Sequence, residues 1–482
     1  MNSRVMPKRS THEMDLTKGP IFKQLLIYSI PLILTNIIQS LFNVADTTIL
    51  GIFVNEHAVG AVGCTNSLIN LCIGLFVGLS AGANVVMAKY VGAKNEQGAH
   101  RTVGTSIIVS LISGFFLMIV GVVFARTFLT WMGVSETLIG DATKYLQIYF
   151  MGMPIMLLYN FIASILRAVG DTTRPLIYLL IGGALNVGLN VFCILVLNLT
   201  VEGVAIATIA SQVVTATLSI IALLRSKGYA RIKAKNLRIH KTELKDIIRI
   251  GLPSGIQGVL FNIANVLVQT NVNAYGEIAT SGNAISSQFD AFIYTTGNAI
   301  AIACMVFVSQ NLGAGKIHRI RKVVGVAMLF SAVVTAVMGL AMFLASDLLI
   351  GIMANDVQVI TFAKYRLTVL TLTYFLCPVM ECFAFTMRAL GKSITAMIIS
   401  LVGICVFRIL WVNTIYLLNP TPTMLFLVWP ASWVVTIAIY LFFYFPLIKK
   451  LEKNIPLKIP PKQSEGGHIV VHNKDIPKKY KA

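Results

Sequence analysis

The sequence predicts an all-α integral membrane protein with twelve transmembrane helices, arranged as two pseudo-symmetric six-helix lobes around a central cavity. Composition is the first reason, because 56% of the 482 residues are hydrophobic, 12% are charged, and the mean hydropathy is +0.79. A soluble domain of this size could not bury so much apolar surface. The other two reasons are the number of long apolar stretches and an internal repeat.

Twelve apolar stretches are each near the ~20 residues that a bilayer span requires. They lie at about 25–52, 58–88, 102–125, 143–166, 175–198, 201–224, 247–275, 279–310, 323–345, 362–387, 394–418 and 422–447. The chain therefore divides into an N-terminal segment (1–24), a first lobe (25–224), a basic linker (225–246), a second lobe (247–448) and a tail (449–482). We expect the tail, which is rich in Pro, Lys and Gly, to be disordered.

The repeat relates the two lobes by an offset of 221 residues. Short landmarks recur in order: Gly92-Ala93 as Gly313-Ala314, Gly104 as Gly325, Arg167-Ala168 as Arg388-Ala389, and Gly170 as Gly391. Two similar helical bundles that can rock around a central site are typical of secondary transporters. The repeat therefore favours a transporter over an enzyme.

The net charge of +20 is distributed unevenly between the two sides of the membrane. With a cytoplasmic N-terminus, 34 of the 39 Lys and Arg residues fall on the cytoplasmic side. Four fall on the opposite side (Arg126, Lys144, Lys364 and Arg366), and Arg408 lies inside a span. This asymmetry follows the positive-inside rule. It predicts a multi-pass protein of the plasma membrane with both termini in the cytoplasm, no cleavable signal peptide, and no nucleic-acid partner.

Motifs for enzymatic, metal or ATP-driven chemistry are not found in the sequence. The seven cysteines lie in predicted spans without metal-type spacing, and none of the seven histidines lies in a span. His468 and His472 in the tail are more simply solvated than metal-bound. We find no HExxH, no GxSxG with a His partner in a span, and no Walker A sequence. We expect no cofactor, no metal site and no enzyme activity, but a secondary carrier.

Polar residues within the spans are the candidate functional groups. Asn36, Gln39, Asn43 and Asp46 share one face of the first span, because their spacings follow the helical period. The seventh span repeats the pattern with Asn262, Asn265, Gln269 and Asn273, and Asn186 and Asn190 stand one turn apart in the fifth. These faces predict the walls of a water-filled cavity. Hydrogen bonding between packed helices is the alternative explanation for each amide.

Three carboxylates lie well within predicted spans, where an unpaired charge is costly. We interpret Asp46 as a proton or cation site, because a lone carboxylate is a poor group for joining helices. Asp290 has three possible roles: it takes part in transport, forms a structural ion pair, or caps a broken helix. Glu381 is structural if Arg408 reaches it from the next helix, and otherwise is a candidate for transport.

Several sequence fragments resemble the multidrug and toxic compound extrusion (MATE) transporters from about residue 18 to 450. They are FNVADTTILG (42–51), YVGAKN with NLGAGK, ILRAVGDTTRP with TMRALGKS, the stretch 185–212, and SGNAISSQFDAFIY (281–294). The settings of Asp290 and Glu381 are similar to the Gram-positive-type, DinF-like branch rather than the NorM-like branch. In the latter, the C-lobe cation site would fall on Phe261 and Cys377, which are not carboxylates.

The resemblance implies a V-shaped pair of lobes that exports amphipathic, often cationic compounds in exchange for Na⁺ or H⁺. It also implies an N-lobe cation site at Asp46, Asn186, Asn190 and Thr208, with an amide, Asn190, where the family has a second carboxylate. A site with one negative charge favours H⁺, while the neutral oxygens keep Na⁺ open. The expected partners are organic cations or amphipathic drugs and the lipid bilayer, and we expect a monomer.

The superfamily also contains flippases for lipid-linked oligosaccharides, which is the alternative function. A cavity for their phosphates would need several basic side chains. Arg408 is the only basic residue predicted deep in a span, which disfavours the flippase. The remaining candidates for the substrate cavity or for coupling are Asn36, Gln39, Asn43, Asn262, Asn265, Gln269, Asp290, Glu381 and Arg408.

Overall fold

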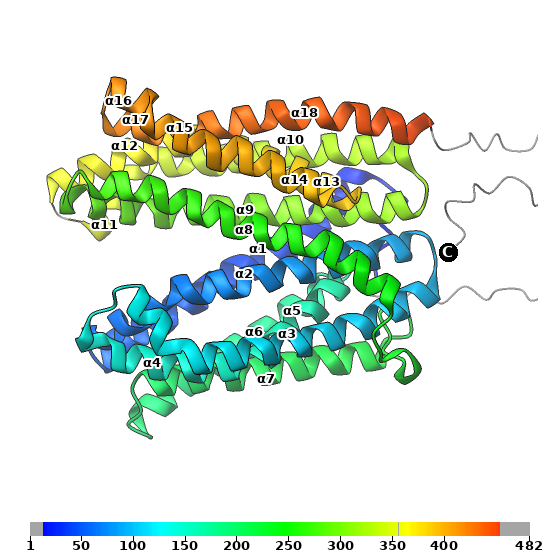
Figure 1. Ribbon diagram of the computed structural model, residues 1–482, viewed down its shortest axis with the longest axis horizontal. Coiled ribbons are helices and arrows are strands. Elements are labelled where there is room, and N and C mark those ends of the chain that lie inside the picture. The colour runs from blue at the N-terminus through cyan, green and yellow to red at the C-terminus, as the bar shows by residue number, and fades with distance from the viewer. Residues whose placement is uncertain (1–12, 355, 454–482) are drawn as a thin grey trace, which may run out of the picture.

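The first lobe contains six membrane spans, one of which is broken. The computed structural model describes residues 13–354 and 356–453. The described part of the chain forms helices and connecting loops, without a strand (Figure 1). The helices of the N-lobe are α1 (Ile21–Phe53), α2 (Glu56–Gly92), α3 (Glu96–Trp131), α4 (Glu136–Met151), α5 (Met153–Ala168), α6 (Thr173–Leu195) and α7 (Val201–Arg225).

The second lobe repeats this arrangement with more interruptions. Its helices are α8 (Lys241–Asn273), α9 (Glu277–Gly313), α10 (Ile317–Leu344), α11 (Ser346–Met353), α12 (Val357–Thr373), α13 (Leu376–Ala389), α14 (Ser393–Ser400), the π-helical η2 (Leu401–Val406), α15 (Phe407–Asn413), α16 (Ile415–Leu418), α17 (Pro422–Phe426) and α18 (Val428–Lys453). Ten helical stretches are long and apolar enough to span a membrane, and two bent pairs bring the number to twelve. The predicted twelve-span architecture is confirmed.

The two broken spans are the predicted fourth and tenth, which occupy equivalent places in the two lobes. The α4–α5 pair bends by 51° and the α12–α13 pair by 52°. The first bend lies at Gly152, where an added Cβ would come within 2.6 Å of the Ile209 side chain. Pro154 and Pro378 stand in the first turns of α5 and α13, where a missing N–H costs no helical hydrogen bond. The second half of each broken span, α5 or α13, contributes residues to the space between the lobes.

The linker between the lobes is shorter than predicted, because α8 already begins at Lys241. The connection 226–240 contains a single 3-10 turn, η1 (Ala234–Asn236), and packs against the N-lobe. The Thr105 hydroxyl donates to the Arg238 carbonyl oxygen at 3.4 Å, and Tyr229 is buried. The linker is therefore part of the N-lobe surface rather than a free tether.

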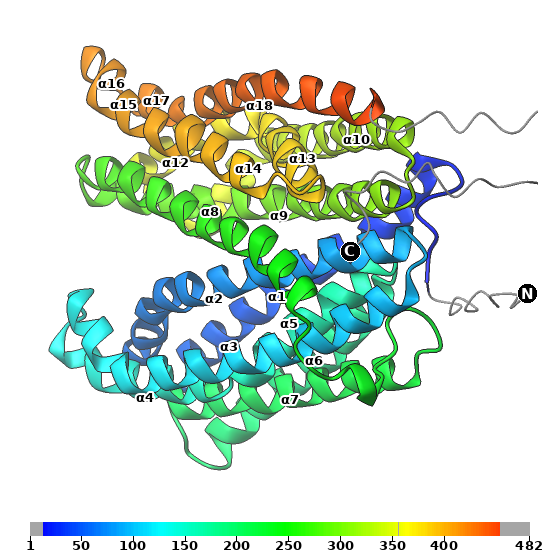
Figure 2. The same ribbon diagram turned by 45° about the vertical axis from the view of Figure 1, so that its right-hand side comes forward.

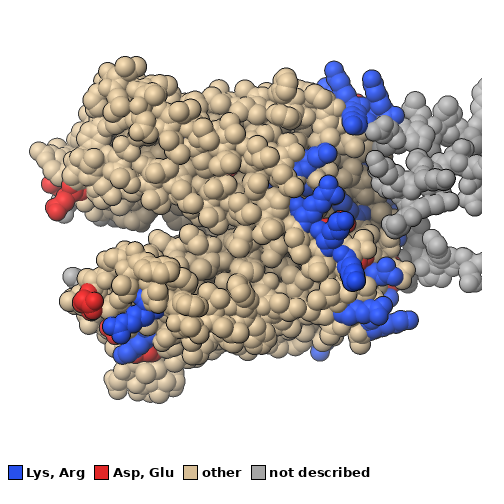
Figure 3. Space-filling model, viewed as in Figure 1, with Lys and Arg blue, Asp and Glu red and all other residues tan. Residues whose placement is uncertain are grey.

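Lys and Arg side chains gather at one end of the molecule, which we call the basic end (Figure 3). The exposed basic residues of the linker and of the α2–α3 turn lie here: Lys94, Arg225, Lys227, Arg231, Lys233, Lys235 and Arg238. The two lobes converge at this end and diverge toward the other, which gives a V shape (Figure 2). The cleft between them opens at the end opposite the basic end (Figure 3).

Close backbone contact between α2 and α8 joins the lobes in the half nearer the basic end. An added Cβ at Gly82 would lie 2.8 Å from the Gly251 nitrogen, and one at Gly251 would lie 2.6 Å from the Leu79 Cα. Side chains are thus excluded from this crossing, as at other close crossings of membrane helices. Asn36 of α1 adds a hydrogen bond to the Thr295 carbonyl oxygen of α9 at 3.2 Å.

Residues 13–19, which we call the N-terminal strap, cross the basic end and contact both lobes. The backbone N–H of Leu16 donates to Gln310 Oε1 at 3.3 Å, and Lys316 Nζ donates to the Thr17 carbonyl oxygen at 2.7 Å. Toward the N-lobe, an added Cβ at Gly170 would lie 2.8 Å from the Met14 nitrogen. Leu16 is completely buried. The rest of the predicted N-terminal segment (1–12) and the tail from 454 lie outside the described residues.

Candidate functional site

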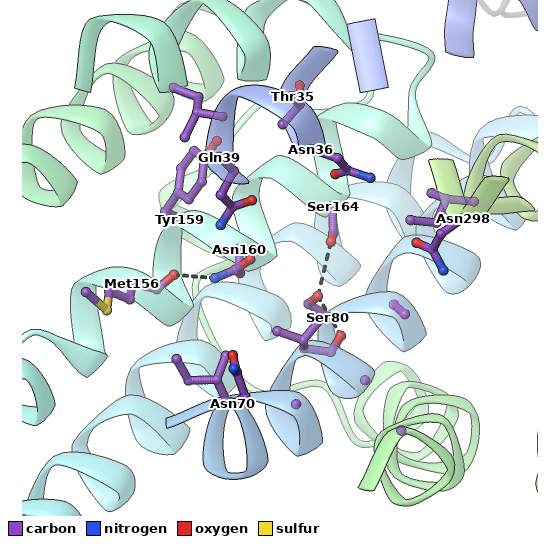
Figure 4. Close-up of a pocket in the computed structure, with 18 of the residues that line it drawn as sticks. Thr35, Asn36, Gln39, Asn70, Ser80, Met156, Tyr159, Asn160, Ser164 and Asn298 are labelled. Carbon is purple, nitrogen blue, oxygen red and sulfur yellow. Dashed lines mark hydrogen bonds between the residues drawn. The ribbon is translucent and has the colours of Figure 1, made fainter. Parts of the chain in front are cut away.

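A cavity of about 660 Å³ lies between the two lobes. Its walls come from α1, α2, α4, α5, α6 and α7 of the N-lobe and from α8, α9 and α13 of the C-lobe. Figure 4 shows Asn36 and Gln39 of α1 near Asn160 and Ser164 of α5, with Asn298 of α9 on the opposite side. Eight of the residues proposed from the sequence line it: Asn36, Gln39, Asn43, Asp46, Asn186, Thr208, Asn262 and Glu381.

The N-lobe polar cluster joins α1, α6 and α7 around Asp46. Asn190 Nδ2 donates to Asp46 Oδ1 at 2.6 Å, and Asn186 Nδ2 donates to Thr208 Oγ1 at 3.4 Å. Asn190 is fully buried behind Asp46 and does not line the cavity itself. The helical spacing brings these four residues together, since Asn186 and Asn190 are one turn apart on α6. The cluster offers one carboxylate and several neutral oxygens, a set that suits a proton or a small hard cation.

Glu381 of α13 is the carboxylate that the C-lobe presents to the cavity. Asn298 Nδ2 donates to Glu381 Oε2 at 2.9 Å, and the Tyr294 side chain also hydrogen-bonds to it. Pairing of Glu381 with Arg408 is not observed. Arg408 instead donates to Asn265 Oδ1 at 2.7 Å and to Ser432 Oγ at 3.3 Å. Arg408 is turned toward α8 and α18 and does not line the cavity. Glu381 therefore stays accessible from the cavity.

Asp290 lies outside the cavity in a buried ion pair within the C-lobe. Its Oδ2 accepts from Arg366 Nη2 at 2.6 Å and from Arg366 Nε at 3.0 Å. The structural ion pair is therefore the interpretation that the geometry matches. Arg366 is buried within α12, inside the stretch 362–387 that the sequence predicts as the tenth span.

The polar stripe of α8 is mostly taken up by contacts inside the C-lobe. Asn265 accepts from Arg408, and Gln269 bonds to both Asn273 and Asn283. Only Asn262 of the four predicted residues faces the cavity. For Asn265 and Gln269 the alternative explanation, hydrogen bonding between helices, is what the structure shows. The stripes of α1 and α8 resemble each other in sequence but differ in exposure to the cavity.

Two arginines that the sequence placed with the cytoplasmic loops line the cavity. They are Arg167 at the end of α5 and Arg388 at the end of α13. Arg408, the only basic residue that the sequence places deep in a span, does not line the cavity, whereas these two residues at helix ends do. The internal repeat already singled out both residues, because they occupy equivalent positions, and that signal could have located them. Asn160, Tyr294 and Asn298 are further lining residues that the analysis of the sequence did not name.

Comparison with known proteins decides the family. The MatE family model matches residues 31–192 and 253–412, which is more than half of the chain and covers both lobes. The chain belongs to the MatE family. This is a family of multi-pass membrane transporters and not of enzymes, as the repeat and the absence of catalytic motifs predicted.

Relatives and solved structures of MatE proteins match over most of this chain. A probable multidrug resistance protein, YoeA of Bacillus subtilis, is 26% identical over 396 residues, which are 80% of this chain and 85% of the relative. The multidrug export protein MepA of Staphylococcus saprophyticus is 22% identical over 82% of this chain and 88% of its own. An outward-facing MATE transporter superposes with a TM-score of 0.85 at 21% identity, covering 92% of this chain and all of that one. The structural likeness confirms the two-lobe fold.

Proposed function

We propose that the protein is a secondary multidrug transporter that exports amphipathic, cationic compounds by antiport with H⁺ or Na⁺. The main support is the placement of Asp46 in the wall of the cavity between the lobes. One of its oxygens accepts from Asn190, and no described side chain donates to the other. The relatives are named as multidrug resistance and multidrug export proteins, which agrees with this substrate class.

Competition for Asp46 would couple the two fluxes. Without a proton or cation, the carboxylate attracts a positively charged substrate, and the low-dielectric protein walls of the cavity strengthen that attraction. Binding of H⁺ neutralises that attraction, and Na⁺ bound by Asp46 with Asn186 and Thr208 would do the same. With the basic end in the cytoplasm, the cleft faces outward and releases the substrate there. Inward movement of one cation supplies ~2.3 kcal/mol per 100 mV of membrane potential.

Flipping of an anionic lipid is the second candidate function. The observation that favours it is the pair Arg167 and Arg388 in the cavity, since guanidinium groups bind phosphates well. The carboxylates Asp46 and Glu381 line the same cavity and would repel a substrate with only negative charges. We therefore place the flippase second, and we propose the Gram-positive-type branch for the chain.

Dye efflux from vesicles tests the primary proposal. Purified protein is reconstituted, a fluorescent cationic dye is loaded, and H⁺ and Na⁺ gradients are imposed separately on wild type and Asp46→Asn. We expect H⁺-driven dye movement in the wild type and its loss in the variant. Movement with Na⁺ alone would shift the coupling ion to the Asn186, Asn190 and Thr208 oxygens. No movement under either gradient would contradict drug antiport and favour the flippase.

A further inference from the structure

The two cavity arginines are related by the internal repeat. Arg167 and Arg388 are the next-to-last residues of α5 and α13, the inner halves of the two broken spans. Each is followed by a glycine with positive φ, 95° at Gly170 and 79° at Gly391, which starts the turn at the basic end. The cavity therefore receives one guanidinium from each lobe on the side nearer the basic end.

Neither guanidinium has an acidic partner within ion-pair distance among the described residues. Arg167 Nε donates to the Ala163 carbonyl oxygen of its own helix at 3.1 Å. Arg388 Nη2 donates to Gln257 Oε1 at 2.9 Å, and its guanidinium lies 4.4 Å from the centre of the Phe385 ring. Its buried Nε has no hydrogen-bond partner. Both side chains thus keep donors that no described group of the protein occupies.

Other arginines that are buried or half-buried in the described chain either have an acidic partner or lie away from the cavity. Arg366 pairs with Asp290, and Arg174 pairs with Asp171. Arg408 binds two neutral groups, Asn265 and Ser432, but does not line the cavity. An unpaired buried guanidinium is costly unless an anion reaches it for at least part of the working cycle. The two cavity arginines therefore differ from the rest in being open to a ligand.

We propose that Arg167 and Arg388 form an anion subsite that binds the carboxylate or phosphate of a zwitterionic amphiphile. The cationic group of the same molecule would lie toward Glu381 and Asp46. Glu381 and Arg388 are seven residues apart on α13, which corresponds to about 10 Å along a helix. A molecule with opposite charges at about that separation matches both groups on the C-lobe wall. This inference rests on the proposed function and specifies its substrate class.

The N-lobe wall has the same spacing without the negative charge. The position equivalent to Glu381 is Asn160. It lies seven residues before Arg167 on α5 and also lines the cavity. We therefore expect Glu381 and Arg388 of α13 to bind the two opposite charges of the zwitterion. Arg167 would add a second donor to the anionic group. Guanidinium groups suit this role because they bind carboxylate and phosphate with two parallel hydrogen bonds.

A matched pair of dyes tests the subsite. A cationic xanthene dye is used as its ethyl ester and as its free acid, so that the two ligands differ by one carboxylate. Binding to the purified, full-length protein is measured by fluorescence anisotropy for the wild type, Arg167→Gln and Arg388→Gln. We expect each variant to lose about tenfold in affinity for the free acid, while affinity for the ester changes by less than about twofold. Arg388→Lys should recover part of the loss.

Two controls separate charge recognition from structure. Arg126→Gln removes an exposed cation away from the cavity and should leave both affinities unchanged.

Competition by a short-chain phosphatidic acid and by inorganic phosphate then distinguishes the source of the anion. Displacement of the free acid by the lipid alone assigns the subsite to a lipid headgroup, and displacement by both assigns it to small anions in general.

Equal weakening of ester and acid binding would overturn the subsite, since the arginines would then act only on the shape of the cavity. Unchanged affinity for the acid in both variants would overturn it as well. If wild type binds neither dye, the failure belongs to the proposed multidrug function. If the wild type binds the ester but neither variant loses affinity for the acid relative to the ester, only the anion subsite is contradicted.

Discussion

The two lobes share a backbone plan but present different polar groups to the cavity. In the N-lobe the carboxylate is Asp46 on α1, bonded to one amide, Asn190. In the C-lobe it is Glu381 on α13, bonded to Asn298 and Tyr294. Their repeat-equivalent positions hold Leu267 and Asn160, respectively. The repeat therefore preserves the scaffold, while each lobe places its acidic group on a different helix.

The same contrast holds for buried charge inside the lobes. The C-lobe contains the ion pair between Asp290 and Arg366, and Arg408 with its two neutral partners. In the described residues of the N-lobe, the positions equivalent to Asp290 and Arg366 are Ile69 and Tyr145, both apolar or uncharged and both buried. The C-lobe ion pair thus joins two helices, α9 and α12, whereas the N-lobe pair of Asp171 and Arg174 is a local contact at the start of α6. This difference suggests coupling in the N-lobe and support in the C-lobe.

The largest expected effect comes from moving the N-lobe carboxylate. Asp46→Asn should abolish ion-coupled efflux, because no other carboxylate contacts its cluster in the described chain. Exchanging the pair, as Asp46→Asn with Asn190→Asp, keeps one carboxylate and one amide in hydrogen-bond contact. We expect this double variant to recover part of the ion-driven dye transport in vesicles. If the double variant transports no more dye than Asp46→Asn, the carboxylate is required at position 46 itself and not only somewhere in the cluster.

The second effect is on stability and concerns the C-lobe ion pair. Asp290→Asn or Arg366→Gln leaves one buried charge without its partner and should lower the free energy of unfolding by about 3–5 kcal/mol. The double variant Asp290→Leu with Arg366→Met should be less destabilised than either single one, as thermal melts in detergent would show. The exposed pair of Lys364 and Asp347 is the matched control, and Asp347→Asn should cost less than about 1 kcal/mol. Full stability in Asp290→Asn would contradict a structural role.

The N-terminal strap provides a test of how the lobes are held together, because it belongs to neither. Leu16 is fully buried between them, so Leu16→Ala should weaken the closed basic end by about 2 kcal/mol. Faster hydrogen exchange in the strap and near Gln310 would report this opening. Leu348→Ala, at an exposed position of α11, is the control and should leave exchange unchanged. Unchanged exchange in Leu16→Ala would mean that the direct contacts between the lobes, such as Gln310 with the Ala168 carbonyl oxygen, close this end without the strap.

The smallest effect separates the two cavity carboxylates. Glu381→Gln keeps the side-chain size and should weaken binding of a cationic dye by about three- to fivefold, with ion-driven transport retained. The converse variant Asn160→Glu gives the N-lobe wall the same group and should strengthen binding by a similar factor. Loss of ion coupling in Glu381→Gln would place a coupling carboxylate in each lobe and end the division of roles proposed above.

Local patterns predicted the architecture and the N-lobe cluster well. Hydropathy located the twelve spans because apolar length is a local property of the chain. The stripe on α1 and the pair on α6 were assigned to one cavity because helical periodicity fixes their faces. The branch of the family, the coupling ion and the orientation of the termini stay predictions.

Contacts between residues far apart in the chain could not be predicted from the sequence. The partners of Arg366 and Arg408 come from helices far apart in the chain, so neither the ion pair with Asp290 nor the bonds to Asn265 and Ser432 could be read locally. The bends in the fourth and tenth spans likewise depend on packing as well as on proline. Arg167 and Arg388, which the sequence placed with the loops, lie at the ends of the second halves of these bent spans and line the cavity.

The sequence by itself determined the class of protein, the two-lobe repeat and the identity of the polar stripes, because hydrophobicity and helical period act within a few turns of the chain. Only the tertiary structure decided which polar groups face the cavity and which are neutralised inside a lobe. The physical reason is that a buried charge is defined by its partner, and partners such as Arg366 for Asp290 are set by helix packing.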